Sequence, residues 1–316
     1  MQIRFLGSIG SVSGSRLEVT YKGKVGFIDC GLFQGPKELR QRNWLPVENA
    51  AKAQWVLLTH AHIDHSGYLP KFHKDGFRGK IYCSEATQVL SEIMLLDAAH
   101  LQEEDAKFAN MTGHSHHKPA LPLYDTHDAQ AVLRHFESKP LEQWIPLNDG
   151  LQFRLFRAGH ILGSTFIQLS YPDHGGQKII TFSGDMGRYG SLMLKDPVTL
   201  PETNYLVVES TYGDRAVTKS NIEVDLAGIV TKVLGRGGTL LIPAFAVGRT
   251  QDILYLLTKL TAEKKIKKPR VVIDSPMATR VTEVYRHYSK WLKTAFNPTV
   301  LEALENSDFE YTSDAD

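Results

Sequence analysis

A tight group of histidine and aspartate side chains is the most chemically informative stretch of this 316-residue sequence. The string LLTHAHIDHSG at residues 57–67 contains His60, His62, Asp64 and His65. Neutral imidazoles and carboxylates are the usual protein ligands of zinc and related ions. A polar surface loop rich in histidine is the alternative interpretation, but the sequence before the motif favours a metal site.

The residues before the motif predict how its side chains are positioned. Residues 55–58 read WVLL, an apolar run typical of a buried strand. Because His60 and His62 are two residues apart, a helix does not present both on one face. A turn at the end of a strand can direct both toward one ion, with Asp64 and His65 directed toward a second ion beside it.

Three further strand ends carry side chains of the same kind. His160 lies in RAGHILGS, Asp185 in TFSGDMG and Asp29 in FIDCG, each with glycine nearby. Small residues at these points let backbone and ligands approach closely. Four strand ends that each deliver histidine or aspartate predict a two-metal site at one edge of a sheet structure.

The composition limits the class of protein. The net charge is +1 and the pI about 7.8, so charge alone does not indicate a nucleic-acid partner. Two cysteines form no disulfide framework and fit a reducing compartment. The first residues do not resemble a signal peptide, and no apolar run approaches the ~18 residues of a membrane span. We therefore expect a cytoplasmic protein with no membrane partner.

The chain predicts two domains, residues 1–209 and 210–316. The first half contains short β-prone runs, a hairpin at YKGKV, a helix from Glu85 to about Ala109 capped by Ser84, and a helix capped by Thr126. TNYLVVEST reads as a buried strand. After Glu209, GGTLLIPAF and PRVVI read as strands that each precede a helix, which favours a small α/β unit.

Together these motifs resemble the metallo-β-lactamase superfamily. FIDCG, THAHIDHSG, AGHILGS and FSGD match its first four motifs in order, and ESTYGDR, IPAFAVGRTQ and DSPMA resemble the β-CASP branch that processes RNA or DNA. The likeness extends over about residues 1–290 and is strongest to bacterial β-CASP ribonucleases, relatives of the eukaryotic pre-mRNA 3′-end endonuclease subunit. It implies an α/β fold: an αββα sandwich followed by a partial α/β β-CASP domain.

The resemblance also implies roles for individual residues. His60, His62 and His160 match the ligands of one metal, Asp64 and His65 those of the other, and Asp185 the bridging carboxylate. Asp29 matches an aspartate that braces the histidine turn from outside the metal site, and Glu209 an acidic residue that orients a later catalytic histidine. Two zinc ions are expected, with manganese as the alternative, and Asp64 and Asp185 are the groups expected to orient the attacking water.

One departure from the family pattern concerns later histidines. β-CASP enzymes bring two more, one as a general acid and one as a metal ligand, but only His287 follows Asp185 here, in a helical pattern. We expect the second metal to bind weakly and catalysis by this chain to be impaired. The chain is expected to be a shortened form, because it ends within the inserted domain.

Phosphate contacts are expected from the second half. PAFAVGRTQD turns into a helix at Arg249 and Thr250, and helix N-termini bind anions. Ser275 in DSPMATR has a similar position. A solvated arginine and simple helix caps are the competing interpretation for these residues.

The function expected from all these features is a nuclease. A metal-bound water or hydroxide would hydrolyse phosphodiester bonds, with single-stranded RNA as the substrate and DNA as an alternative; a homo-oligomer is compatible with the sequence. Two other hypotheses stay open: a hydrolase of a small ester, thioester or lactone, and a catalytically impaired β-CASP partner protein. The α/β unit after Glu209 argues against the first, and the intact histidine turn argues against the second.

Overall fold

A computed structural model describes residues 1–115, 117–216, 221–293 and 309–311 of the chain. The chain divides into two compact units. Unit 1 comprises Met1–Tyr189 and Asp196–Glu209, and unit 2 comprises Gly190–Lys195 and Ser210–Asp316. None of the described helices is both long enough and apolar enough to cross a membrane.

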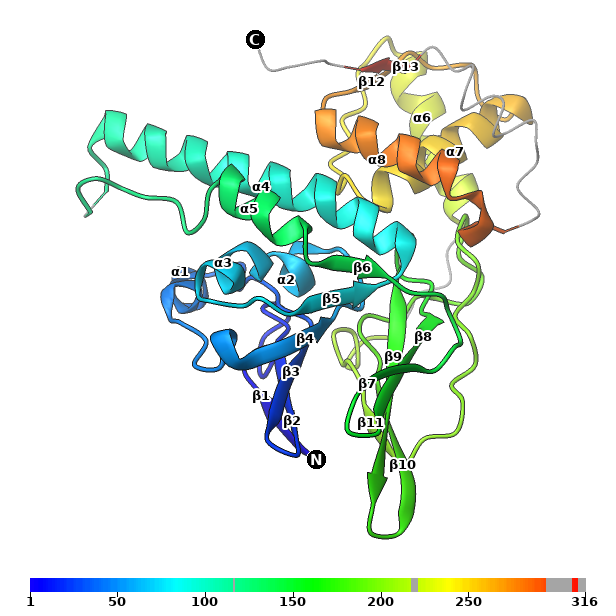
Figure 1. Cartoon of the computed structure of the whole chain (residues 1–316). Helices are drawn as coiled ribbons and strands as arrows, with labels where there is room; N and C mark the ends of the chain where they lie inside the picture. Colours follow the sequence, from blue (N-terminus) through cyan, green and yellow to red (C-terminus); the bar gives the residue numbers. More distant parts are fainter. Residues whose placement is uncertain (116, 217–220, 294–308, 312–316) are drawn as a thin grey trace. The chain divides into compact units, whose positions relative to one another are not determined.

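Unit 1 is built from two β-sheets and a group of helices (Figure 1). Its strands are β1 (Gln2–Phe5), β2 (Leu17–Tyr21), β3 (Lys24–Ile28), β4 (Ala53–Leu57), β5 (Lys80–Cys83), β6 (Phe136–Ser138), β7 (Ile145–Asn148), β8 (Leu151–Arg157), β9 (Thr165–Asp173), β10 (Gly176–Phe182) and β11 (Tyr205–Val207). Its helices are α1 (Lys37–Gln41), α2 (Ile63–Ser66), α3 (Leu69–Lys74), α4 (Glu85–Thr112) and α5 (Thr126–Leu133), with 3-10 turns η1 (Arg42–Trp44) and η2 (Ala50–Lys52).

The strand order determines which strand ends meet. The first sheet runs β1-β2-β3-β4-β5-β6, antiparallel up to β3 and parallel from β3 to β6. The second runs β11-β10-β9-β8-β7, with only the β10–β11 pair parallel. The predicted hairpin between β2 and β3 is confirmed: Lys22 and Gly23 at its tip have φ values of 47° and 76°, as two-residue hairpin turns of this kind require.

Apolar side chains from both sheets form the main core of unit 1. Leu57 of β4 packs in one cluster with Phe153 of β8 and Phe182 of β10, and these side chains are at most 1% exposed. A second cluster joins the other face of the first sheet to the helices, with Val56 and Phe72 both fully buried. Burying each such side chain stabilises the fold by ~1.5–3 kcal/mol.

The α/β fold expected from the sequence is confirmed for unit 1, with one qualification about its layers. The helices α2, α3, α4 and α5 precede β7 in the chain and belong with the first sheet (Figure 1). The described residues of unit 1 contain no helix after β6. A second helical layer, as in a complete αββα sandwich, is therefore not formed by unit 1 itself.

Two local expectations for unit 1 were wrong. Asp125, not Thr126, caps α5, because the Asp125 carboxylate accepts a hydrogen bond from the Asp128 N–H and the Asp128 carboxylate accepts one from the Asp125 N–H. The strand at β11 is not buried, since Tyr205 is 53% and Leu206 47% exposed. As the last strand of its sheet, β11 has a strand neighbour on one side only, so its apolar residues stay partly in water.

Unit 2 is smaller and mostly helical in its described residues. It contains α6 (Ile222–Gly235), α7 (Arg249–Ala262), α8 (Pro276–His287), a 3-10 turn η3 (Ser289–Trp291), and the parallel strands β12 (Val271–Ile273) and β13 (Phe309–Tyr311). Val230, Leu257 and Leu260 lie at the centre of its core. The strand expected at GGTLLIPAF does not form: residues 238–245 have no strand partner, and Leu241 and Phe245 are 88% and 82% exposed. A strand needs a hydrogen-bonded neighbour, and the described residues provide none there.

Candidate metal centre

The histidine turn follows β4 directly and is held by its own backbone. His60 is fully buried after the apolar residues of β4, and His62 is the residue before the first turn of α2. The N–H groups of His65 and Ser66 both donate to the His62 carbonyl at 2.9 Å, and the Ser66 hydroxyl donates to the Ala61 carbonyl at 2.8 Å. This compact turn directs the side chains of His60 and His62 toward one group of candidate ligands. It directs those of Asp64 and His65 toward a second group beside it.

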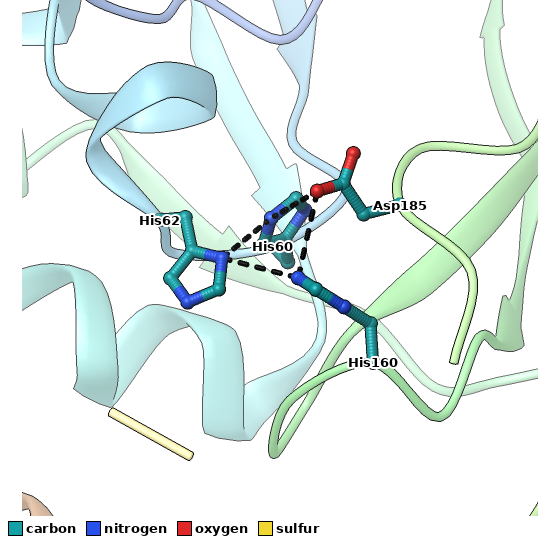
Figure 2. Close-up of side chains that lie close together, drawn as sticks. All are labelled: His60, His62, His160 and Asp185. Atoms are coloured by element: carbon teal, nitrogen blue, oxygen red, sulfur yellow. Dashed lines mark hydrogen bonds and ion pairs between the residues drawn. The ribbon is translucent and has the colours of Figure 1, made fainter. Parts of the chain in front are cut away.

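Four side chains from three strand ends converge on one point (Figure 2). His60 Nε2 and His160 Nε2 each lie 3.2 Å from His62 Nδ1. Asp185 Oδ2 lies 3.5 Å from His160 Nε2 and 3.9 Å from His60 Nε2. All four donor atoms lie within 4.8 Å of one another.

These separations fit a single divalent ion. Ligand atoms at about 2.0–2.1 Å from zinc in a tetrahedral site are about 3.3 Å apart. The closest nitrogen–nitrogen distances here are 3.2 Å. Three imidazoles and a carboxylate are also the donor types that zinc prefers, so the first group of side chains is suited to a metal without rearrangement.

A second group lies on the other side of Asp185. His65 Nε2 is 3.2 Å from Asp185 Oδ1 and 3.8 Å from Asp64 Oδ2. Asp185 thus directs one oxygen to the first group and the other oxygen to His65. This arrangement suits a carboxylate between two ions, although the second group offers only three side-chain donors.

Asp29 and Thr59 hold the imidazoles from behind. The Asp29 carboxylate accepts from the Thr59 N–H at 2.7 Å and from the Thr59 hydroxyl at 2.9 Å, and lies 2.7 Å from His65 Nδ1. The Thr59 hydroxyl, already donating to Asp29, accepts from His60 Nδ1 at 3.0 Å. Protons on these Nδ1 atoms leave both Nε2 atoms free to face the centre, as is usual for metal-binding histidines.

Close backbone contacts explain two of the glycines. A Cβ on Gly31 would lie 1.6 Å from the Asp64 carbonyl oxygen, and one on Gly187 would lie 1.9 Å from the Gly159 carbonyl oxygen. Only glycine permits these approaches. The FIDCG segment therefore packs directly on the histidine turn, and the segment after Asp185 packs directly on the segment that carries His160.

The electrostatic setting keeps the three imidazoles of the first group neutral. Burial, with help from neighbouring imidazoles, lowers the pKa of His60 well below its usual value and that of His62 to about 3. Burial also lowers the pKa of His160, although Asp185 partly opposes this. Neutral imidazoles have a lone pair available for a metal at neutral pH.

The second group carries opposite charges. Burial alone would lower the pKa of His65, but the Asp29 and Asp185 carboxylates outweigh it and raise that pKa well above its usual value. Burial alone would raise the pKa of Asp185, but contact with His65 and the other imidazoles lowers it to about 2. Burial raises the pKa of Asp64. A cation entering here would replace the proton on His65.

Glu209 lies close to Asp185 in the chain fold. Its Oε1 accepts a 2.6 Å hydrogen bond from the Met186 N–H, and its own N–H donates to the Ser183 hydroxyl at 3.0 Å. These bonds tie the end of β11 to both sides of Asp185. His287, at the end of α8, is exposed, and its Nδ1–H donates to the Glu283 carbonyl of the same helix at 2.8 Å.

The candidate phosphate-binding residues lie in unit 2. The hydroxyls of Thr250 and Ser275 make hydrogen bonds to backbone groups close in sequence. The Thr250 hydroxyl donates to the Phe245 carbonyl at 2.8 Å. Ser275 caps α8 by accepting from the Ala278 N–H at 3.1 Å. Arg249 is exposed at the start of α7, after Gly248 with φ of 86°. The structure places Arg249 and Thr250 together at one helix start and Ser275 at another.

Sequence reasoning missed two residues near the centre. Thr59 links Asp29 to His60, and a hydroxyl directly before the histidine motif was the available signal. Ser164 accepts from the N–H groups of His160 and Ile161 at 2.9 and 3.2 Å and so shapes the turn that carries His160. A second acidic and histidine group, Asp125, His127 and Asp128, mainly serves helix capping and a 3.0 Å ion pair from Asp128 to Lys74.

Comparisons with known proteins show which families the chain resembles. The family model of the metallo-beta-lactamase superfamily matches residues 21–236, more than half of the chain, and the Beta-Casp domain model matches residues 250–316. A crystal structure of a protein of unknown function from Enterococcus faecalis has a TM-score of 0.51 at 16% identity, covering 98% of this chain and 75% of that one. That likeness concerns the fold alone.

Curated relatives share sequence along nearly the whole chain. The chain is 33% identical to a ribonuclease of Thermus thermophilus, covering 98% of this chain and 68% of the relative. It is 28% identical to an RNase J-like protein of Methanocaldococcus jannaschii, covering 96% and 64%. It is 27% identical to a transcription termination factor of Cenarchaeum symbiosum, covering 97% and 46%. The chain thus spans about two thirds of the first two relatives and less than half of the third.

Proposed function

The chain belongs to the metallo-beta-lactamase superfamily, and from this premise we propose that it carries the hydrolytic centre of a metal-dependent ribonuclease of the Beta-Casp type. The substrate is single-stranded RNA, with DNA as the alternative. The observation that carries the proposal is Asp185, which directs its two carboxylate oxygens to two adjacent groups of candidate ligands. The names of the relatives support RNA as the substrate class.

The proposed cofactor is a pair of zinc ions, with manganese as the alternative. His60, His62, His160 and Asp185 would hold one ion, and Asp64, His65 and Asp185 the other. Bound divalent ions supply Lewis-acid chemistry: they acidify a coordinated water and offset charge that develops on a phosphate. Because the second group has only three donors, the second ion is expected to bind more weakly.

The residues of the chain have distinct roles in this proposal. Asp64 and Asp185 would orient the attacking water. Asp29 fixes the ring of His65 through a 2.7 Å contact. Glu209 holds the loop of Asp185 through the Met186 N–H. This contact differs from the role expected for Glu209 from the family pattern, in which it orients a catalytic histidine.

Phosphate contacts are proposed for unit 2. Arg249 at the start of α7 offers a charged fork for phosphate oxygens, and Thr250 and Ser275 offer hydroxyls at helix starts. The two cysteines are buried and free, in keeping with a reducing compartment, and we propose that the protein acts in the cytoplasm.

The test is metal-dependent cleavage of end-labelled single-stranded RNA. Zinc or manganese is added to the metal-free protein. A chelator is then added, which should stop cleavage by removing the metal. Asp185→Ala is expected to abolish cleavage, because both groups of ligands lose their shared carboxylate. Asp105→Ala, which removes an exposed aspartate of α4, is the matched control and is expected to cleave like the parent.

The same assay separates the competing functions. Hydrolysis of a model ester or lactone without any RNA cleavage would move the protein to the small-substrate hydrolases. Tight metal binding without hydrolysis of either substrate would favour a partner protein that has kept its metal centre.

A further inference from the structure

A buried arginine lies beneath the histidine turn. Arg16, just before β2, is only 3% exposed. No ion pair joins it to a carboxylate in the part of the chain that the structure describes, and burial lowers the pKa of its guanidinium. A buried charge without a charged partner is costly unless polar groups compensate for lost water, so its location needs a specific explanation.

The guanidinium is held by backbone, amide and aromatic partners. Arg16 Nε donates to the Gly31 carbonyl at 2.7 Å, and Nη2 donates to Asn43 Oδ1 at 3.0 Å. Its carbon Cζ lies 3.6 Å from the centre of the Tyr68 ring and 5.0 Å from that of Phe33. Cation–π contact of this kind favours arginine over lysine.

Two of these partners flank the histidine turn. Gly31 belongs to the FIDCG segment, and Tyr68 follows the turn directly and donates its N–H to the Cys30 carbonyl at 2.9 Å. Arg16 therefore contacts the segment beneath the turn and the residue at the exit of the turn.

A short chain of hydrogen bonds leads from Arg16 to the second group of ligands. The Gly31 N–H donates to the Ser15 carbonyl at 2.9 Å, and the Ser15 N–H donates to the Asp64 carbonyl at 2.8 Å. The Cys30 N–H donates to the His65 carbonyl at 2.7 Å. The residues directly before Arg16 and Gly31 are thus bonded to the backbone carbonyls of Asp64 and His65.

The first group of ligands is held by other means. The ring of His60 is oriented by Thr59, and the backbone of His160 by the Ser164 hydroxyl. Neither bond is made to a direct partner of Arg16, and the Asp29 carboxylate of the FIDCG segment reaches His60 only through Thr59, whereas it contacts His65 directly. Loss of Arg16 should therefore affect the two groups unequally.

We propose that Arg16 is a positioning residue that holds Asp64 and His65 in place for the second ion. It clamps the Gly31 carbonyl and the Tyr68 ring, which fixes the backbone of α2 against the FIDCG segment. The inference rests on the proposed two-metal function, but the contacts that carry it are made between residues of the chain itself.

The first readout needs no metal. The Nδ1–H of His65 faces Asp29 at 2.7 Å in a buried setting, so its exchange with water, followed by imidazole ¹⁵N NMR, reports the position of the ring. In the metal-free Arg16→Met variant this exchange is expected to accelerate at least about tenfold, whereas that of His60 Nδ1–H changes little.

The second readout is calorimetric titration of the metal-free chain with Zn²⁺. Arg16→Met is expected to weaken the second binding step by about 10–100-fold while the first step stays within about twofold, as for other residues that support a ligand from behind. Arg16→Lys keeps the charge and one donor and is expected to recover part of the loss. Arg42→Met is the matched control, because Arg42 also lies over the Phe33 ring, at 4.1 Å, but is exposed and bonds only to the Leu6 carbonyl.

Defined outcomes would overturn the proposal. A folded Arg16→Met variant with unchanged exchange at His65 would do so, as would equal weakening of both binding steps. If Arg16→Met does not fold, the Arg16→Lys variant is measured in its place. An Nδ1–H exchange rate at His65 equal to that of the parent chain then overturns the proposal. A parent chain that binds no Zn²⁺ would refute the proposed function instead, and the exchange measurement would still judge Arg16.

Discussion

The candidate metal ligands of unit 1 and the candidate phosphate contacts of unit 2 differ in how far they are prearranged. In unit 1, His60, His62 and His160 already face one another at ligand distances, and the ring of His60 is braced by the buried Thr59. In unit 2, Arg249 is exposed and the hydroxyl of Thr250 is engaged by its own turn. The imidazoles of unit 1 can accept a metal without rearrangement. A phosphate that binds unit 2 would have to order the exposed side chain of Arg249.

The difference follows from burial. A buried imidazole can keep only those conformations that its neighbours allow, so the cost of ordering the ligands falls within the folding free energy. An exposed arginine loses that freedom only when it binds. We therefore expect large effects from changes in the metal region and small effects from changes in the phosphate region.

The largest effect is expected from His62→Ala. This change removes the nitrogen that lies 3.2 Å from both other imidazole nitrogens. Losing one of four ligands should cost about 2.5–4 kcal/mol, a quarter of the ~10–16 kcal/mol typical of such zinc sites, or roughly 10²–10³-fold in Kd. Competition with a chromophoric chelator measures it. His287→Ala, which removes an exposed histidine of α8, should bind zinc like the parent, and similar losses in both variants would contradict the assignment.

A smaller effect is expected from Thr59→Val. The substitution keeps the shape but removes the hydroxyl that links Asp29 to His60. Metal affinity and RNA cleavage should each fall by about 10–100-fold. Thr181→Val is the matched control, because Thr181 is also buried and hydrogen-bonded but lies within the second sheet. If Thr59→Val binds metal like the parent while Thr181→Val does not, the bracing role is wrong.

The stability of unit 2 should depend on pH through one carboxyl group, that of Asp252. Burial raises the pKa of Asp252 in α7 to about 6, with Arg249 opposing the shift. The folded state thus binds more protons than the unfolded state between the two pKa values, and stability falls as pH rises from about 4 through 6. Above pH 6 we expect Asp252→Asn to be about 1–2 kcal/mol more stable than the parent, after allowance for solvent screening, and near pH 3.5 about equal.

Amide hydrogen exchange within α7 measures this effect locally. Asp225→Asn, at an exposed aspartate in the first turn of α6, is the control and should show little change across the same pH range. A stability gain that is equal at pH 3.5 and pH 7 would exclude the titration of Asp252 as its cause.

The smallest effect is expected from Arg249→Met. Because Arg249 is exposed and would meet phosphate only on binding, KM for RNA should rise about 3–10-fold with kcat unchanged, and the slope of log affinity against log salt should weaken by about one. Arg236→Met, at an exposed arginine where α6 ends, serves as the control. A fall in kcat with constant KM would place Arg249 in the chemical step. The phosphate contacts of unit 2 would then act in catalysis, as the metal ligands of unit 1 are expected to do.

Much of the fold could be predicted where the signal is local. The helix from Glu85 with its Ser84 cap is confirmed, since Ser84 accepts from the Thr87 N–H, and the hairpin at Lys22 and Gly23 is confirmed by its turn geometry. The strand expected at GGTLLIPAF, residues 237–245, does not form, because a strand depends on a partner elsewhere in the chain.

The candidate site also has features that local sequence predicts and features that depend on distant residues. The spacing of His60, His62, Asp64 and His65 is a property of consecutive residues, and glycine beside His160 and Asp185 indicates further strand ends. These local patterns suffice to name the candidate ligands and the family.

Residue type and short-range spacing are written in consecutive positions, so the candidate metal ligands and the elements that carry them can be predicted from the sequence. The folded chain adds that His160 and Asp185 meet the histidine turn, that Thr59 and Asp29 orient two of the rings, and that Arg16 contacts the segment next to this turn. Those contacts join residues up to 125 positions apart in the chain, as between His60 and Asp185. They depend on how two sheets pack over a common core, and no local pattern of side chains encodes that geometry.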